Sequence, residues 1–209
     1  MKTYALTVTC PSARGVVAAI ANYLADQGCN ISDSAQFDDK ETGGFFMRVS
    51  FESEADVDLA TLSDGFADAA RPFDMAYEFH DEAVKMKVVI MVSRFGHCLN
   101  DLLYRWRIGA LPIDIVAVVS NHMEYQKVVV NNDIPFHCIK VTAENKADAE
   151  ARIMAVVEDA GAELIVLARY MQILSDEMCQ KMSGRIINIH HSFLPSFKGA
   201  NPYKQAFQR

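Results

Sequence analysis

The chain has 209 residues, of which 51% are apolar and 22% are charged, an ordinary globular composition that allows one large or two small domains. It has no apolar run long enough to span a bilayer, and its first residues do not resemble a signal peptide, so we expect a cytoplasmic protein that binds no membrane. The net charge of −7 arises in residues 1–80, which carry −8, and this acidity argues against binding nucleic acid there.

The five cysteines are scattered, odd in number and form no C-x-x-C pair. This pattern predicts reduced, mostly buried thiols rather than a disulfide framework. The sequence shows no spacing of His, Cys, Asp or Glu that is typical of metal ligands, so we expect no metal site.

Residues 1–80 predict a small domain whose strands alternate in polarity. Residues 4–9 alternate between apolar and polar side chains, as expected of a strand with one buried face. The helix that follows is expected to have Ser12 as its N-cap and Gly28 as its stop, with an apolar stripe at Val16, Val17, Ile20, Ala21 and Leu24.

The rest of this domain completes a ferredoxin-like βαββαβ order. The turn signal Thr42-Gly43-Gly44 separates two predicted strands, and Ser53 is the expected cap of a second helix. The predicted elements are strands at residues 29–37, 45–51 and 74–80 and a helix at residues 54–70.

Two turns of this domain resemble the ACT family of regulatory domains. The matching residues are Cys10-Pro11 with Gly15, and Gly28-Cys29-Asn30-Ile31. The resemblance implies a homo-oligomer that binds an amino-acid effector, such as glycine or methionine, with Pro11, Gly15, Asn30 and Ile31 as the binding residues. The alternative is that these residues only shape the turns.

After a polar connector at residues 81–86, the pattern changes from alternation to continuous apolar runs. Such runs predict strands that are buried on both faces. The predicted strands are residues 88–92, 113–119, 135–141, 164–168 and 185–190, and the helices are residues 98–107, 124–131 and 146–160. Strands that alternate with helices predict a Rossmann-like, mostly parallel α/β domain over residues 87–209, with ligands beyond the carboxyl ends of its strands.

The turn after the first of these strands, residues 93–98, has a single glycine. It therefore lacks the glycine-rich fingerprint of dinucleotide binding, which argues against a nicotinamide cofactor. His97 follows this strand end, where it either faces the ligand cleft or merely begins a helix.

Asn188 and His190 are the strongest candidates for chemistry. Alternate residues of a strand project to the same face, so an amide and an imidazole would lie together at the end of the last strand. The amide can bind a carbonyl oxygen and the imidazole can move a proton. For an isolated N-x-H tripeptide, the favoured interpretation is that both residues only satisfy local backbone groups.

The surrounding residues favour the chemical interpretation. Residues 188–199, Asn-Ile-His-His-Ser-Phe-Leu-Pro-Ser-Phe-Lys-Gly, closely resemble the signature of folate-dependent formyltransferases and formyl hydrolases. Residues 167–174 resemble that family's pterin-binding strand end and loop. Residues 97–103 and 131–136, together with an ACT domain followed by a formyltransferase domain, are similar to the formyltetrahydrofolate deformylase family in particular.

This resemblance implies that 10-formyltetrahydrofolate is the substrate and that water attacks its formyl carbon. Formate, which can feed purine synthesis, and tetrahydrofolate leave; folate is then the substrate, and no cofactor is implied. Asn188 would hold the formyl oxygen, and His190 would polarise the formyl group and assist proton transfer. The implied substrate-binding residues are His97, Met171, Gln172, Ile173 and Leu174, although Gln172 departs from the arginine often found at its position.

The family's site has a third residue, an aspartate well downstream of the N-x-H pair, for which the chain offers no match before Arg209. We therefore expect a formyltransferase domain that lacks its C-terminal part and turns over slowly or not at all; robust formate release by residues 1–209 would contradict this expectation. Two alternatives stay open: an amine formyltransferase that uses the same folate, and a non-catalytic amino-acid sensor built on the ACT domain.

Overall fold

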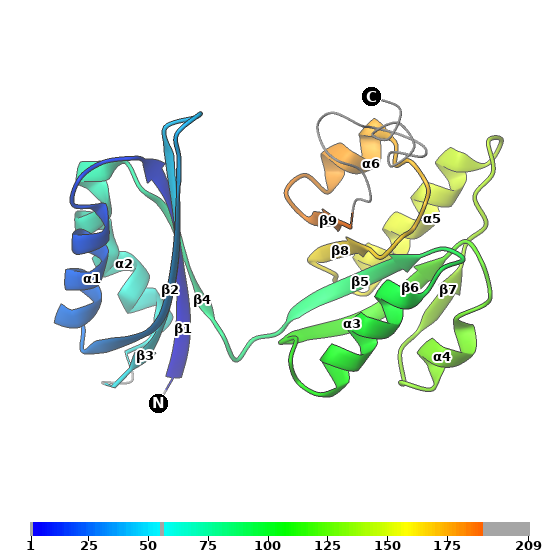
Figure 1. The fold of residues 1–209 in the computed structure, drawn as a ribbon, viewed down its shortest axis with the longest axis horizontal. Helices are drawn as coiled ribbons and strands as arrows, with labels where there is room; N and C mark the ends of the chain where they lie inside the picture. The colour runs from blue at the N-terminus through cyan, green and yellow to red at the C-terminus, as the bar shows by residue number, and fades with distance from the viewer. Residues whose placement is uncertain (1, 55–56, 190–209) are drawn as a thin grey trace, which may run out of the picture. The chain divides into compact units, whose positions relative to one another are not determined.

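A computed structural model describes residues 2–54 and 57–189 and divides the chain into two compact units, Met1–Val84 and Lys85–Arg209 (Figure 1). Each unit is built on its own sheet, one of four strands and one of five. His190 and the rest of the formyl-enzyme signature lie outside the described residues. Within the described ranges, no helix is long and apolar enough to cross a membrane.

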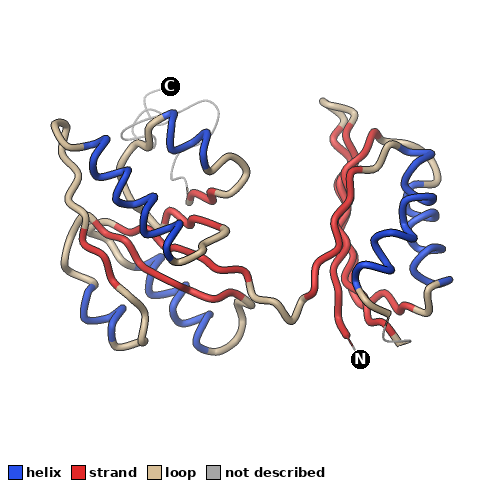
Figure 2. The backbone as a smooth tube through the Cα atoms, turned by 180° about the vertical axis from the view of Figure 1, so that it is seen from behind, coloured by secondary structure: helices blue, strands red, loops and turns tan. Residues whose placement is uncertain are grey.

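The N-terminal unit is an antiparallel sheet with the strand order β2-β3-β1-β4. Both of its helices cover the same face of the sheet (Figure 2). This is the ferredoxin-like architecture expected from the sequence. Its elements are β1 (Lys2–Pro11), α1 (Val16–Asp26), β2 (Cys29–Asp39), β3 (Gly44–Ser53), α2 (Leu59–Ala70), the short 3₁₀ helix η1 (Arg71–Phe73) and β4 (Ala76–Asp81).

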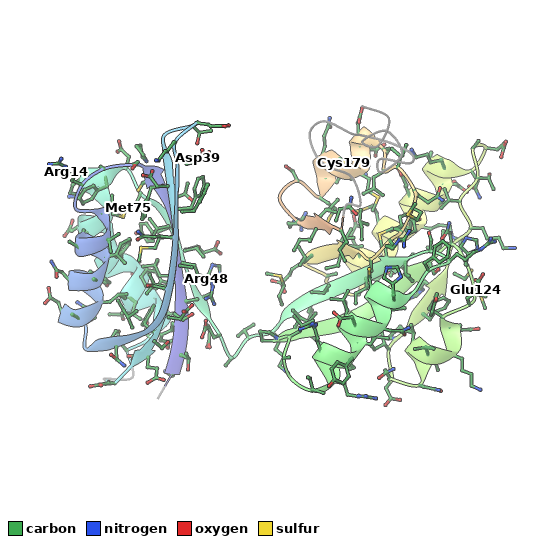
Figure 3. All side chains as sticks on the ribbon, in the orientation of Figure 1. Arg14, Asp39, Arg48, Met75, Glu124 and Cys179 are labelled. Carbon is green, nitrogen blue, oxygen red and sulfur yellow. The ribbon has the colours of Figure 1, made fainter. Side chains whose placement is uncertain are left out.

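Burial alternates along the central strands of this sheet. In β3, Phe45 packs into the core beneath the helices, whereas the next residue, Phe46, is 42% exposed on the other face. Arg48, labelled in Figure 3, extends from the same open face and pairs with Glu82 at 2.7 Å. One face of the sheet therefore supplies the core, and the other presents side chains to the surface.

Both helix caps predicted for this unit are wrong, because β1 and β3 extend further than expected. The Ser12 backbone N–H donates to the Gly43 carbonyl next to the hairpin, and α1 begins after Gly15, which has a φ of 94° and makes no side-chain cap. Ser53 is the last residue of β3, and its hydroxyl accepts a hydrogen bond from the Val57 N–H at 3.0 Å.

Asp58 is the true cap of α2, since its carboxylate accepts a hydrogen bond from the Thr61 N–H at 2.9 Å. Two smaller expectations also fail in this unit. Val17, placed in the apolar stripe of α1, is 40% exposed. The last strand starts at Ala76 and not at residue 74, because Asp74 has a left-handed backbone with a φ of 49°.

The C-terminal unit is a parallel sheet with the strand order β7-β6-β5-β8-β9. Helices α5 and α6 pack on one face, and α3 and α4 pack on the other (Figure 1). The elements are β5 (Met86–Val92), α3 (His97–Arg107), β6 (Ile113–Ser120), α4 (Gln126–Val130), β7 (Phe136–Cys138), α5 (Lys146–Asp159), β8 (Leu164–Leu167), α6 (Asp176–Lys181) and β9 (Ile186–Asn188).

Strand β5 is buried on both faces. Val89 and Met91 face the core beneath α5, and Val88 and Ile90 face the core beneath α3. This confirms the doubly wound parallel sheet that the continuous apolar runs predict.

The strand order places a topological switch point in the middle of this sheet. From β5 the chain moves outward to β6 and β7, then crosses back through α5 to β8 on the other side of β5, and finally reaches β9. The direction of strand addition therefore reverses between β5 and β8. In open α/β sheets, ligands bind beyond the carboxyl ends of the strands at such a point.

Candidate functional site

A buried serine connects the three strands that end around the switch point. Ser93, directly after β5, places its hydroxyl 2.7 Å from Asn121 Oδ1, beyond β6, and against the carbonyl oxygen of Tyr170, beyond β8. Its backbone N–H donates to the Arg169 carbonyl at 3.2 Å. The loops at this edge of the sheet are thus held in one arrangement.

The loop after β8 has a strained backbone. Arg169 and Met171 have φ values of 60° and 59°, a left-handed conformation that residues other than glycine rarely adopt. Such strain persists only where the surrounding structure enforces it, and it concentrates at functional sites. The sequence predicted this loop as a substrate contact without any indication of its conformation.

Two residues anchor the loop and two project from it. Tyr170 is buried and Leu174 packs against the core under α5, whereas Met171 is exposed and Ile173 is 86% exposed. Gln172, between them, is half-buried. Of the four predicted pterin-binding residues, Met171 and Ile173 therefore offer free apolar surface at the carboxyl edge of the sheet.

The anchor at Tyr170 lies close to a buried carboxylate. Burial, with a further contribution from the charge of Glu150, raises the pKa of Tyr170 to about 12, so its hydroxyl stays neutral at physiological pH. Glu150 is itself buried and accepts a hydrogen bond from the Ser175 N–H at 2.9 Å. These two groups hold the loop onto α5.

Asn188 ends the neighbouring strand. In the parallel register of β8 and β9 it lies opposite Leu167, and the Ile189 N–H donates to the Leu167 carbonyl at 3.4 Å. Its side chain is exposed. Asn188 is therefore placed at the carboxyl edge beside the strained loop, where the sequence expected it, while its predicted partner His190 is outside the described residues.

The loop after β5 is closed by a tyrosine. Tyr125 accepts a hydrogen bond from the Gly96 N–H at 2.7 Å, and its hydroxyl lies 3.4 Å from the Arg94 carbonyl. His97 is the first residue of α3 and is exposed. The one glycine N–H of this loop is thus already bound, which agrees with the missing phosphate-binding fingerprint.

A cavity of about 460 Å³ lies between α5 and α6. It is lined by Glu150, Met154, Ser175, Met178 and Lys181, among others, and contains none of the predicted site residues. Ser175 directly follows the strained loop, so the cavity adjoins the candidate site but does not include Asn188.

The predicted effector residues of the N-terminal unit form two separate groups. Pro11 ends β1 opposite Gly44 of β3, and Gly15 precedes α1. Asn30, with Ile31 after it in β2, lies opposite Glu52, at the other end of β3. The two groups are about 27 Å apart along the sheet, so one chain does not bring them together.

Sequence reasoning missed Arg169 and Tyr125. The sequence did contain one indication of Arg169, because a cationic residue there follows an apolar strand within the formyl-enzyme motif. No local signal points to Tyr125, because it reaches Gly96 from a distant part of the chain.

Comparison with known proteins defines both units. The family model of the formyl transferases matches residues 86–209, and that of the ACT domain matches residues 4–62. The second unit also resembles the solved phosphoribosylglycinamide formyltransferase of Coxiella burnetii, with 30% identity and a TM-score of 0.52 over 60% of this chain and 60% of that one. The class of the protein is thus a formyl transferase-type enzyme with an ACT domain.

The relatives that span both units narrow this class. A formyltetrahydrofolate deformylase of Corynebacterium is 44% identical over 99% of this chain and 72% of its own length. The solved formyltetrahydrofolate deformylase of Burkholderia mallei is 44% identical, with a TM-score of 0.85 over 100% of this chain and 74% of that one. The chain belongs to the formyltetrahydrofolate deformylase family.

Proposed function

We propose that this chain hydrolyses 10-formyltetrahydrofolate to formate and tetrahydrofolate in the cytoplasm, and that the formate supplies purine synthesis. The observation that carries the proposal is the position of Asn188, at the carboxyl end of β9 and one strand away from the switch point. Because the chain belongs to the deformylase family, the group that this amide would bind is a formyl group on a folate nitrogen.

In the proposed reaction, the Asn188 amide donates a hydrogen bond to the formyl oxygen. Water adds to the formyl carbon, and that oxygen gains negative charge in the tetrahedral intermediate. A donor fixed in place before the reaction stabilises this charge more than the neutral substrate. The carbon–nitrogen bond then breaks, the folate nitrogen takes a proton, and formate leaves.

Proton transfer is assigned to His190. An imidazole with an ordinary pKa of about 6.5 is present in both protonation states at physiological pH, so it can accept a proton from water and return one to the leaving nitrogen. The assignment rests on the sequence spacing from Asn188 and on the family motif.

The strained loop is the proposed contact for the pterin ring, and His97, the exposed first residue of α3, is a further proposed contact. Met171 and Ile173 provide exposed apolar surface, and the backbone groups of Gln172 provide polar contacts. Because the loop is fixed by Tyr170 and Ser93, binding would order few side chains, which lowers its entropic cost.

Formyl transfer to a phosphate-bearing amine has less support. Such an acceptor needs free backbone N–H groups at the loop after β5, and Tyr125 already binds the Gly96 N–H. Formate release should therefore be unchanged when glycinamide ribonucleotide is added.

The test is formate release from 10-formyltetrahydrofolate, measured with formate dehydrogenase, alongside calorimetric titration with the same folate. Asn188→Ala should lower kcat by about 10²- to 10³-fold, the usual loss for one oxyanion donor. Asn22→Ala is the matched control, because Asn22 is an exposed amide on α1. Unchanged kcat in Asn188→Ala would remove the proposed role, and the absence of both folate binding and formate release in the unaltered protein would remove the function.

For the N-terminal unit, we propose pairing of two copies around an amino-acid effector, glycine or methionine. The support is geometric: the two predicted effector groups lie at opposite ends of one sheet and can meet only across two chains. Sedimentation with and without each amino acid tests this. Amino-acid binding by a chain that stays monomeric would contradict it, and amino-acid binding without any folate binding would favour the sensor.

A further inference from the structure

Arg169 is a cationic side chain in the candidate site that has no ion-pair partner in the described part of the chain. Its Nε is buried and makes no hydrogen bond, and no ion pair within residues 2–54 and 57–189 includes it. Its guanidinium carbon lies 5.1 Å from the centre of the Phe95 ring. A buried donor that is left unsatisfied costs free energy, and nearly all such groups in native proteins have a partner.

The arginine lies at the topological switch point. Arg169 follows β8 and Phe95 follows β5, the two strands between which the order of the sheet reverses. The Arg169 carbonyl accepts the Ser93 N–H, so the backbones of the two loops are joined at this position. The guanidinium, which has no ion-pair partner among the described residues, is therefore at the crevice in which this type of sheet binds its ligands.

The backbone at Arg169 is one that glycine would adopt at lower cost. Its φ of 60° is strained for an arginine, and it is maintained by the hydrogen bond to Ser93 and by the burial of Tyr170. Stacking on the Phe95 ring then limits where the guanidinium can point. The result is a positioned charge rather than a freely moving one.

Neighbouring cations differ from Arg169 in having carboxylate partners. On the loop after β5, Arg94 lies 3.8 Å from Glu124, and on α3, Arg105 lies 2.8 Å from Asp101. Both are exposed surface pairs. Arg169 is more buried than these two arginines, and no described carboxylate pairs with it. A binding site for an anionic ligand is expected to have such a cation.

We propose that the Arg169 guanidinium binds a carboxylate of the ligand at the switch point, an inference that rests on the proposed function. The planar fork of a guanidinium matches the two oxygens of a carboxylate. The reaction offers two sources of this chemistry: the formate that leaves with a negative charge, and the glutamate moiety of the folate. Either source satisfies the buried donor only when ligand is present.

The experiment compares Arg169→Gly, Arg169→Gln and Arg169→Lys in the full protein. Glycine fits the positive φ, so Arg169→Gly removes the charge without adding strain. Arg105→Gln is the matched control, because it removes an exposed arginine from the same unit. Fluorescence of Trp106, the only tryptophan, verifies that each variant is folded.

Two titrations distinguish the sources. Sodium formate is used as a product inhibitor and as a calorimetric ligand, and 10-formyltetrahydrofolate is compared with 10-formyltetrahydropteroate, which lacks the glutamate. Arg169→Gly and Arg169→Gln should weaken binding of one carboxylate by about 10- to 100-fold, and Arg169→Lys by less. Weaker inhibition of the variants by formate would show that Arg169 binds the formate. A KM raised only for the glutamate-bearing substrate would show that Arg169 binds the glutamate of the folate.

The proposal falls if Arg169→Gly matches the unaltered protein in formate inhibition and in the KM of both substrates. It also falls if Arg105→Gln shows the same losses, since a general charge effect would then explain them. Failure of the proposed function is recognised separately, as an unaltered protein that releases no formate. In that case the calorimetric titrations with formate and with both folates still report whether Arg169 binds a carboxylate.

Discussion

The two sheets of this chain differ in how consecutive residues of a strand are buried. In β5 of the C-terminal unit, Ile90 and Met91 are both fully buried, although they face opposite sides of the sheet. In β3 of the N-terminal unit, Phe45 is buried and Phe46 is exposed. The cause is the helices, which cover both faces of the parallel sheet and only one face of the antiparallel sheet.

This difference determines where polar side chains can lie in each unit. The central strand of the parallel sheet is buried on both faces, and polar groups of this unit lie where strands end, at Ser93, Arg169 and Asn188. The antiparallel sheet carries polar groups along its open face, where Arg48 and Glu82 also bind the Ser50 hydroxyl. The proposed ligand site thus lies at the strand ends of one unit, and the proposed pairing involves the sheet of the other.

The largest expected effect tests the burial difference directly. Ile90→Ala and Met91→Ala should each lower the free energy of unfolding of the C-terminal unit by about 2–5 kcal/mol, because each leaves a cavity in one of the two cores. In the N-terminal unit, Phe45→Ala should cost about 3–5 kcal/mol. Phe46→Ala, at an exposed position, should cost well under this amount.

Urea unfolding can separate the two units, because Trp106, on α3, is the only tryptophan of the chain. Its fluorescence reports the C-terminal unit, and circular dichroism reports both. Equal losses from Phe45→Ala and Phe46→Ala would show that the open face is covered in solution, as it would be in a paired protein.

The second prediction compares two glycine–tyrosine contacts, one in each unit. An added Cβ at Gly96 would lie 2.1 Å from Cζ of Tyr125, within the ring, so Gly96→Ala should destabilise the C-terminal unit by about 1–3 kcal/mol. An added Cβ at Gly65 would meet only the hydroxyl end of Tyr23, at 2.7 Å. Gly65→Ala should cost less, since alanine also favours the helix at that position.

Unfolding monitored by Trp106 fluorescence and by circular dichroism measures both changes. Combining Gly96→Ala with Tyr125→Ala should remove most of the steric part of the loss. If the double variant is as unstable as the sum of its single changes, the contact is not the cause.

The smallest expected effect concerns acid stability. The hydrogen bond from the Thr61 N–H, with a second from its hydroxyl, lowers the pKa of Asp58 below its ordinary value of 3.8. A group whose pKa is lowered by folding stabilises the protein above its unfolded pKa, and this contribution is lost as the pH falls through the folded pKa. The cap of α2 should therefore weaken only below about pH 4.

In the C-terminal unit, α6 is capped by Ser175, which does not titrate in this range. Asp58→Ser should give the N-terminal unit a cap of the same kind. Thermal unfolding followed by circular dichroism from pH 2.5 to 7 should show a smaller acid loss for Asp58→Ser than for the unaltered protein. Parallel pH profiles for the two proteins would exclude the carboxylate cap as a source of acid sensitivity.

The sequence predicted the elements well where one pattern dominates. The continuous apolar run of β5 and the alternation of β1 identified both sheets, because burial on two faces and on one face leave different patterns. It failed at the two helix starts of the N-terminal unit. Ser12 and Ser53 are plausible caps by type, but β1 and β3 pair with each other to their last residues, and this pairing moves both helix starts along the chain.

For the candidate site, the sequence located Asn188 at a strand end, because a short apolar strand followed by polar residues has few other interpretations. It did not find Arg169, whose significance depends on a left-handed backbone and on the absence of a described partner. Neither property can be derived from residue types alone. The contact of Tyr125 with Gly96 was missed for the same reason, since it joins residues that are 29 positions apart.

The switch point also has a consequence for how the C-terminal unit assembles. Its central pair, β5 and β8, joins Val88 to Leu164, whereas β5, β6 and β7 follow one another closely along the chain. Contacts between distant segments form late, because a long loop must close before they are made. During synthesis, a chain that has emerged only as far as β7 has three strands of this sheet but no switch point, which forms only once β8 pairs with β5.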